Sequence, residues 1–276
     1  MAVTYPNSDE KKTVPIEDIG IVLLDHYQLT VTSTLLNKLL ENNVAVISCD
    51  AQHLPLGMFL NLNGHTLQQE HFANQIEVTQ AKKDRLWKQT IQAKISNQAR
   101  LLELQGQNIE KMKRWILKLK NGDPENLEAR AASYYWKNLF TASPSFKRER
   151  FGAAPNGLLN YGYTILRGLV ARALVGSGLL PTLGIHHHNK YNAYCLADDM
   201  MEPYRPFVDQ MVVELVNNGV EELTTESKQF LLKIPTCDVE INQQRSPLML
   251  AVQQTTASLQ QCYAGKSKTL KFPQFV

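Results

Sequence analysis

The residues best suited to bind a cation are two closely spaced acids and a run of histidines. Asp199 and Glu202 are three residues apart in a segment compatible with a helix, so both carboxylates project from one face and Asp198 turns away. Like charges held together in this way need a counter-cation. The run His186–His188 lies just upstream, and because adjacent side chains diverge, one or two of these imidazoles at most can share a site with Asp199.

Glu128 adds a third acid from a different segment. It lies in the stretch Leu127–Trp136, which otherwise consists mainly of alanine and aromatic residues typical of a buried helix. A carboxylate among such residues indicates close packing around a ligand. Carboxylates combined with imidazole favour Mg²⁺ or Mn²⁺ over Zn²⁺, which more often takes cysteine or several histidines. The spacing alone leaves the alternative open that these acids are solvated and that the histidines form a surface turn.

The first part of the chain predicts a small β-rich domain over residues 1–72. Short runs rich in β-branched and apolar residues at Ile19–Leu24, Val44–Ser48 and Leu56–Leu60 are typical of strands. Between the first two, leucines at helical spacing over Leu35–Leu40 predict a helix, with Thr30 and Thr32 as candidate caps.

From residue 73 onward strand signals almost vanish, and the sequence predicts an all-helical domain over residues 73–276. Apolar residues recur every three or four positions through two amphipathic helices between residues 87 and 119. The fold class is therefore α+β, with a larger helical part that carries the acids. Further helices are predicted at residues 127–139, 157–177, 197–217, 225–232 and 246–263, and the tail from Lys266 onward is predicted to be extended or disordered.

Positive charge is concentrated between Lys82 and Lys120. The whole chain carries a net charge of +3, whereas this segment has eleven basic and three acidic residues, a net charge of +8. Such a segment is either a solvated helix face or a surface that binds nucleic-acid phosphates, and the sequence leaves both open.

Length and composition exclude several other classes of protein. A chain of 276 residues with 43% hydrophobic residues can bury a large core. It has neither an apolar run long enough to cross a membrane nor the charged-then-apolar start of a signal peptide, so we expect a cytoplasmic protein with no membrane partner. The four cysteines lie far apart, which argues against a structural zinc site and favours buried reduced thiols.

Four motifs, Glu128–Ala132, Asn160–Gly162, Gly184–His187 and Leu196–Pro206, occur in this order in the chain. Together they resemble the family of CRISPR-associated protein 1. Two N-terminal segments, Thr13–Gly20 and Glu41–Asp50, extend the similarity and most resemble members from type II systems, so it covers nearly the whole chain.

The resemblance implies a small β-rich N-terminal domain, a helical catalytic domain, and a Mg²⁺ or Mn²⁺ site formed by Glu128, His187 and Asp199. His187 is preferred over its neighbours because the family's ligand closes a Gly-apolar-x-His element. Glu202 is expected beside the metal as a supporting or alternate ligand, and Tyr161 is expected to orient a phosphate or ribose oxygen.

The implied activity is that of a metal-dependent DNA integrase and endonuclease. It joins the 3′-hydroxyl ends of a short DNA duplex to a CRISPR repeat by transesterification and also nicks branched DNA. Implied partners are double-stranded and branched DNA, CRISPR-associated protein 2 and a second copy of the chain as a homodimer. Two alternatives are a non-catalytic helical subunit that binds nucleic acid and a metal-dependent hydrolase of small phosphoesters.

One departure from the family pattern concerns the N-terminus. Members of the family normally have one or more extra strands before the segment that begins at Pro15, and here only fourteen residues precede it. We therefore expect an N-terminal sheet that lacks its first strands.

Overall fold

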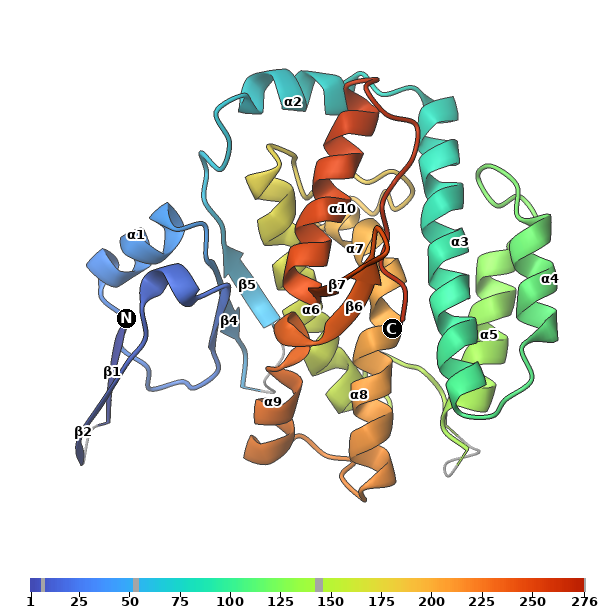
Figure 1. The fold of residues 1–276 in the computed structure, drawn as a ribbon. Helices are drawn as coiled ribbons and strands as arrows, with labels where there is room; N and C mark the ends of the chain where they lie inside the picture. The colour runs from blue at the N-terminus through green and yellow to red at the C-terminus, as the bar shows by residue number, and fades with distance from the viewer. Residues whose placement is uncertain (6–7, 52–54, 142–145, 276) are drawn as a thin grey trace.

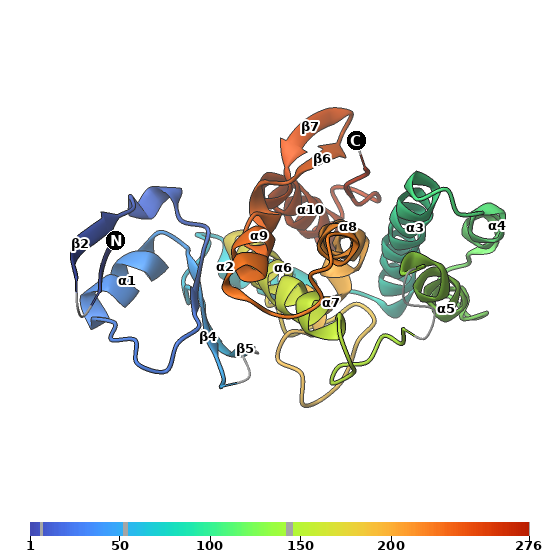
Figure 2. The ribbon, with the colours of Figure 1, turned by 90° about the horizontal axis from the view of Figure 1, so that it is seen from below.

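A small β-rich body and a larger helical body make up the fold (Figure 1). The computed structural model describes residues 1–5, 8–51, 55–141 and 146–275. Seen from below, the N-terminal body lies at one side, and helices α3, α4 and α5 are grouped at the opposite side (Figure 2). The structure therefore has the predicted α+β layout of a small β-rich part and a larger helical part.

The N-terminal body contains two separate small sheets. Strands β3 (Ile21–Leu24), β4 (Ala45–Cys49) and β5 (Pro55–Phe59) form one sheet in that order, with β3 parallel to β4 and β4 antiparallel to β5. Helix α1 (Ser33–Glu41) connects the two parallel strands. It begins where the Thr32 hydroxyl accepts a hydrogen bond from the backbone of Leu35, as the predicted threonine cap requires.

A second sheet precedes Pro15, so the expectation that the first strands are missing is wrong. Strand β1 (Ala2–Tyr5) pairs antiparallel with β2 (Ser8–Thr13). The second strand reads Ser-Asp-Glu-Lys-Lys-Thr and lacks any alternation of apolar and polar residues. Sequence periodicity could not reveal a strand of this composition, because the usual signal depends on one face being buried.

The three-stranded sheet packs against helix α6 (Asn156–Gly176) of the helical body. At Gly168 an added Cβ atom would lie 2.7 Å from side-chain atoms of both Ile21 and Ile47, so the sheet approaches this helix closely only because the residue is glycine. An ion pair of 2.8 Å between Lys228 and Asp25 also joins the two bodies.

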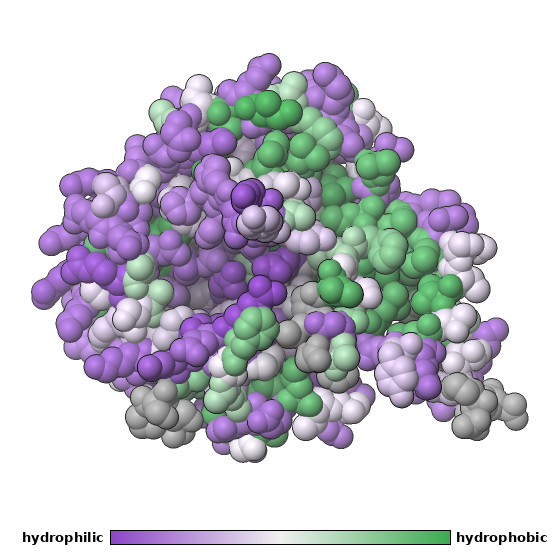
Figure 3. Space-filling model, turned by 180° about the vertical axis from the view of Figure 1, so that it is seen from behind, coloured by the Kyte–Doolittle hydropathy of each residue, from purple (hydrophilic) through white to green (hydrophobic). Residues whose placement is uncertain are grey.

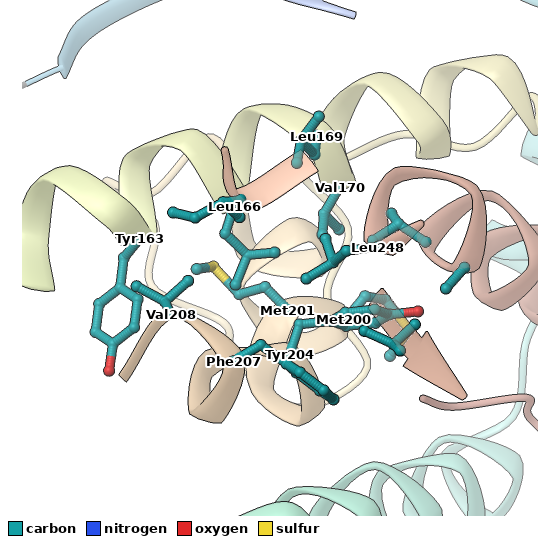
Figure 4. Close-up of a cluster of buried hydrophobic side chains, with 14 of the residues drawn as sticks. Tyr163, Leu166, Leu169, Val170, Met200, Met201, Tyr204, Phe207, Val208 and Leu248 are labelled. Carbon is teal, nitrogen blue, oxygen red and sulfur yellow. The ribbon is translucent and has the colours of Figure 1, made fainter. Parts of the chain in front are cut away.

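The core of the helical body surrounds α6. Leu166 and Val170 of this helix project toward Met201 and Met200, and Leu169 belongs to the same buried cluster (Figure 4). The remaining helices are α2 (Gln68–Ile76), α3 (Gln80–Leu104), α4 (Glu110–Lys118), α5 (Leu127–Leu139), α7 (Cys195–Met201), α8 (Arg205–Asn217), α9 (Thr225–Leu231) and α10 (Leu248–Tyr263). Short 3₁₀ turns cover Ile16–Asp18 (η1), Glu202–Tyr204 (η2) and Ile234–Thr236 (η3).

The C-terminal domain is not all-helical as predicted. Strands β6 (Asp238–Ile241) and β7 (Gln244–Pro247) form an antiparallel hairpin ahead of α10. Its two turn residues, Asn242 and Gln243, have positive φ angles of 53° and 62°. Asn-Gln lacks the glycine that usually marks such a turn, so the local sequence signal was weak.

The helix predicted over residues 197–217 is interrupted. Proline residues at positions 203 and 206 interrupt the backbone hydrogen-bond pattern, and η2 separates α7 from α8 there. This interruption matters for the site, because Glu202 is the first residue of η2.

Two further comparisons with the predictions concern the chain's boundaries. The predicted domain boundary after residue 72 lies inside α2, and α2 packs on α10 of the helical body. The C-terminal tail is ordered, because Gln274 exchanges backbone hydrogen bonds with Glu240 and Leu270 is buried.

Within the described part of the chain, every helix is too short or too polar to cross a lipid bilayer.

Candidate active site

Two acids from different elements converge on one buried lysine. The Lys94 ammonium lies 2.6 Å from a carboxylate oxygen of Glu128 and 2.6 Å from one of Glu202. Lys94 belongs to α3, which packs against both α5 and η2 and so brings the first residues of these elements together. The side chains of Lys94 and Glu202 are 10% and 7% exposed, respectively, so this group of charges is largely shielded from water.

Glu202 is held ionised by two cations. Its other carboxylate oxygen accepts a hydrogen bond of 2.7 Å from Nε of Arg205. Burial alone would raise the pKa of Glu202, but Arg205 and Lys94 outweigh this effect and lower the pKa to about 2. For Lys94, burial acts to lower the pKa, and the carboxylates of Glu202 and Glu128 raise it above its ordinary value.

The start of α5 positions Glu128. Both carboxylate oxygens of Asp123 accept backbone hydrogen bonds of 2.9 Å, one from Leu127 and one from Glu128. Asn126 has a φ of 51°, a left-handed conformation that asparagine tolerates better than most residues. Asp123 therefore satisfies two amides at the helix start and fixes the first turn, from which Glu128 projects.

Asp199 does not share the cation with Glu128 and Glu202. Its side chain is fully buried, and one oxygen accepts backbone hydrogen bonds from Ile185 and His186 at 2.7 and 3.0 Å. The other oxygen lies 3.3 Å from the backbone nitrogen of His187 and 2.5 Å from its Nδ1. These contacts make Asp199 the anchor of the histidine segment, and they occupy its oxygens.

The turn before the histidines requires glycine. A Cβ atom at Gly184 would lie 2.3 Å from the backbone oxygen of His187 and 2.9 Å from the Asp199 carboxylate. Only a residue without a side chain lets the backbone fold this closely around Asp199. The Gly-Ile-His-His motif is therefore a compact loop wrapped around one carboxylate.

His187 is held in this loop by its ring contact with Asp199. The hydrogen bond that the His187 ring donates to Asp199 raises the pKa of His187, burial opposes this, and the charges of Asp199, Glu202 and Glu128 raise the pKa further. When Nδ1 carries the proton donated to Asp199, Nε2 presents a free lone pair. This is the tautomer that a metal-binding histidine needs.

The two neighbouring histidines are placed differently. The His186 ring stacks on Trp87 with 4.1 Å between centroids and 2° between planes. Burial and the charge of His187 lower the pKa of His186. His188 is exposed, and its Nδ1 contacts the backbone oxygen of His186. The three adjacent side chains thus have three different environments, as expected for neighbours that diverge.

Tyr161, which was expected to orient a phosphate or ribose oxygen, has charged neighbours other than the acids described above. Its buried ring has the Lys228 ammonium 5.9 Å from its centroid, and burial together with Asp25 and Cys49 raises its pKa. These neighbours place Tyr161 where α6 meets the N-terminal body.

Tyr163, two positions later, lies near the acids instead, although the sequence had not singled it out. The Arg205 guanidinium lies 4.5 Å above its ring. The Tyr163 hydroxyl donates to Asp209, and so does that of Tyr135 at 2.7 Å. Burial raises the pKa of Asp209 to about 6, against the lowering effect of both tyrosines. No local pattern marked Tyr163, because residues 135, 163 and 209 meet only through packing.

One cavity borders the charged group, and another borders the histidine loop. One of about 190 Å³ is lined by Trp136 and Tyr163, the arginines Arg148 and Arg205, and residues including Lys94, Gln98, Glu202 and Asp209. Another of about 360 Å³ lies beside His187, with lysines at positions 83 and 190 in its wall. Basic side chains therefore line both the cavity beside Glu202 and the cavity beside His187.

Among the described residues, no three side chains of the metal-binding types stand together at ligand spacing. The donor set nevertheless fits a hard divalent cation. The carboxylates of Glu128 and Glu202 already point at one cation, the Lys94 ammonium, and His187 lies within electrostatic range of both. Two carboxylates and an imidazole are ligands that Mg²⁺ and Mn²⁺ accept.

The basic segment between residues 82 and 120 divides into buried and exposed parts. Lys94 is buried in the charged group, so it is not a surface residue free to bind DNA. Arg100 and Lys113 form surface ion pairs with Glu103 and Glu110. Basic residues of the segment that lie on the surface are Arg85, Arg100, Lys111, Lys113, Arg114, Lys118 and Lys120, mostly along α4 and the residues after it.

We expect Asp199→Ala to destabilise the protein by about 3–5 kcal/mol, because it leaves buried amides without an acceptor and His187 without its partner. Chemical denaturation at neutral pH would measure this loss. Asp238→Ala, which breaks a surface ion pair with Arg245, is the matched control and should change the unfolding free energy little. Equal stability of both variants would contradict the anchoring role of Asp199.

Solved structures with the same fold define the class of protein. A casposase bound to an integration product superimposes with a TM-score of 0.80 at 20% identity, over 97% of this chain and 86% of that one. A Cas1 protein from Thermotoga maritima gives 0.74 at 16% identity, over 93% and 90%. A Cas6-RT-Cas1–Cas2 complex gives 0.70 at 19% identity, over 90% of this chain and 31% of that one. The fold is therefore the one that Cas1 proteins and this casposase share.

Sequence comparison then gives the particular family. The sequence model for "CRISPR associated protein Cas1" matches residues 2–234. A CRISPR-associated endonuclease Cas1 from Neisseria meningitidis is 33% identical over 97% of this chain and 88% of its own length. One from Francisella tularensis subsp. novicida is 27% identical over 76% and 72%. The chain belongs to the Cas1 family, as the four ordered motifs indicated.

Proposed function

We propose that this protein is a metal-dependent DNA integrase and endonuclease, which joins 3′-hydroxyl ends of short DNA to a CRISPR repeat by transesterification. The observation that carries the proposal is the convergence of Glu128 and Glu202 on a single cation within electrostatic range of His187. Membership of a family whose relatives are named endonucleases agrees with it.

We assign the metal ligands as Glu128, His187 and Glu202, with Mg²⁺ or Mn²⁺ as the ion. This differs from the set implied by the family resemblance, in which Asp199 was a ligand. The hydrogen bonds of Asp199 favour a different task, which is to hold His187 so that its Nε2 faces the acids. When bound, the metal would lower the pKa of the attacking hydroxyl and screen charge on the phosphate.

The chain's own residues would then bind and orient the DNA. Arg148 and Arg205 line the cavity beside Glu202, where their guanidinium groups suit a phosphate. Arg148 is held by Asn156 and Asn160 at 2.8 and 2.7 Å, so its orientation is set in advance. The exposed basic residues of α4 would grip the DNA backbone without reading its sequence.

We further propose assembly with CRISPR-associated protein 2 and a second copy of this chain. A neighbour in fold is part of a Cas1–Cas2 complex, which supports the first partner. The edge strand β5 exposes Leu56 and Phe59 at 77% and 48%, an arrangement that a partner surface would cover. Figure 3 shows hydrophobic side chains gathered on one half of the face seen from behind.

Strand transfer tests the proposal directly. The protein and its partner would be mixed with a labelled DNA duplex and a supercoiled plasmid that bears the repeat, in Mg²⁺ or Mn²⁺. We expect label to become joined to the plasmid only when metal is present. Absence of joining under all these conditions would refute the integrase function.

The alternative is a non-catalytic subunit that binds nucleic acid. The Lys94 contacts favour it, because a lysine paired with both acids could simply stabilise the fold. Thermal unfolding separates the two functions. Mn²⁺ should raise the melting temperature of the wild-type protein but not of Glu128→Ala. Equal responses of the two proteins would favour the binding-only function.

A further inference from the structure

We propose that Lys94 is a displaceable counter-cation: it holds Glu128 and Glu202 together in the metal-free protein and moves to the Gln98 side-chain oxygen when a divalent metal binds. The inference rests on the proposed function, because it takes these two acids as metal ligands. It concerns the lysine, to which that function assigns no task.

The first part of the argument is the position of the ammonium. Lys94 Nζ is 2.6 Å from an oxygen of each acid, which is the direct contact of a charge-assisted hydrogen bond. A Mg²⁺ or Mn²⁺ ion bound by the same carboxylates needs oxygens at about 2.1 Å and would repel an adjacent ammonium. Metal and ammonium therefore compete for the same carboxylate oxygens.

The second part is the reason for having a cation there at all. Two carboxylates directed at one point in a buried region repel each other when nothing lies between them. Arg205 compensates Glu202 through its other oxygen, but among the described residues Glu128 has an ion pair only with Lys94. Lys94 thus keeps the pair in place before the metal arrives.

The third part is a place for the displaced ammonium. Gln98 is one helical turn after Lys94 on α3, so both side chains lie on the same face. Gln98 is 4% exposed, and its Oε1 is buried with no hydrogen-bond partner within the described residues. A buried acceptor of this kind is costly unless a donor reaches it. Lys94 and Gln98 line the same cavity of about 190 Å³, which gives the ammonium room to move.

Metal affinity provides the test, measured as the Kd for Mn²⁺ by calorimetry on the whole chain. Removal of the competing ammonium in Lys94→Met should lower this Kd by about tenfold. Lys94→Arg keeps a cation and should not show the gain. Lys113→Met removes the lysine of a surface pair with Glu110 and is the matched control, with an unchanged Kd.

Gln98 supplies a second, independent measurement. Gln98→Met removes the acceptor for the displaced lysine and should raise the Kd by about threefold. In the double variant with Lys94→Met, the Gln98 substitution should have no effect, because no ammonium remains to be received. A merely structural lysine would not make the two substitutions depend on each other in this way.

The outcomes distinguish this inference from the proposed function. If Glu128→Ala binds Mn²⁺ as tightly as the wild type, the metal site itself is wrong, and the inference fails with it. If Glu128→Ala loses binding but a folded Lys94→Met binds no more tightly than the wild type, only the role of Lys94 is overturned. Should Lys94→Met not fold, Lys94→Gln and the Gln98→Met measurement carry the test.

Discussion

Glu128→Gln should lower metal-dependent strand transfer by about a thousandfold or more, because it removes the charge of one proposed metal ligand while keeping its shape. The amide can still accept from Lys94, and Asp123 still caps α5, so we expect the variant to remain folded. Gel-based joining of labelled DNA to a plasmid, at saturating Mn²⁺, measures the loss.

The control for this variant is another glutamate of the same region. Glu125→Gln breaks an exposed pair with Lys120 and should leave strand transfer unchanged. DNA binding by Glu128→Gln should also stay close to that of the wild type, since the exposed basic residues are intact. Loss of DNA binding in parallel with activity would mean that Glu128 supports the fold rather than the chemistry.

Replacement of His187 by alanine is the second change with a large expected effect. Its Nδ1 lies 2.5 Å from Asp199, which leaves Nε2 free to bind the proposed metal, so His187→Ala should lose nearly all metal-dependent strand transfer. His186→Ala and His188→Ala should retain a clear fraction of it, because one ring stacks on Trp87 and the other is exposed.

The three histidine variants should be compared at one Mn²⁺ concentration, with the Mn²⁺-dependent rise in melting temperature as a second reading. We expect that rise to disappear only in His187→Ala. Near-wild-type activity in His187→Ala, or equal losses in all three variants, would refute the assignment of this ligand.

Asp199 and Glu202 illustrate what spacing alone can decide. Their separation of three residues predicted that both carboxylates project from one face of the segment. The backbone then tightens into η2 at Glu202, and the two carboxylates reach different partners. Asp199 accepts from the backbone of residues 185–187, whereas Glu202 reaches Lys94 and Arg205. The contact of Glu202 with Lys94, and of Asp199 with the histidine loop, depends on these partners. The spacing of the two acids in the sequence does not reveal them.

The sequence by itself determined several of the helices and the family. Helix α5 runs from Leu127 to Leu139, as its apolar spacing predicted, and α1 begins after Thr32, because both signals come from residues within one or two turns of each other. Its ordered motifs identified the Cas1 family, and Glu128 was placed at the start of a helix.

Only the tertiary structure decided where the charges meet. Lys94, Glu128 and Glu202 come from three elements, and their contact exists because α3 packs against α5 and η2 together. In the sequence Lys94 was one of eleven basic residues in a surface-like segment, since burial depends on the elements that cover a helix face and not on the helix itself. For the same reason Tyr161 and Tyr163, two residues apart on α6, project toward different neighbours, and only packing showed which of them lies near the acids.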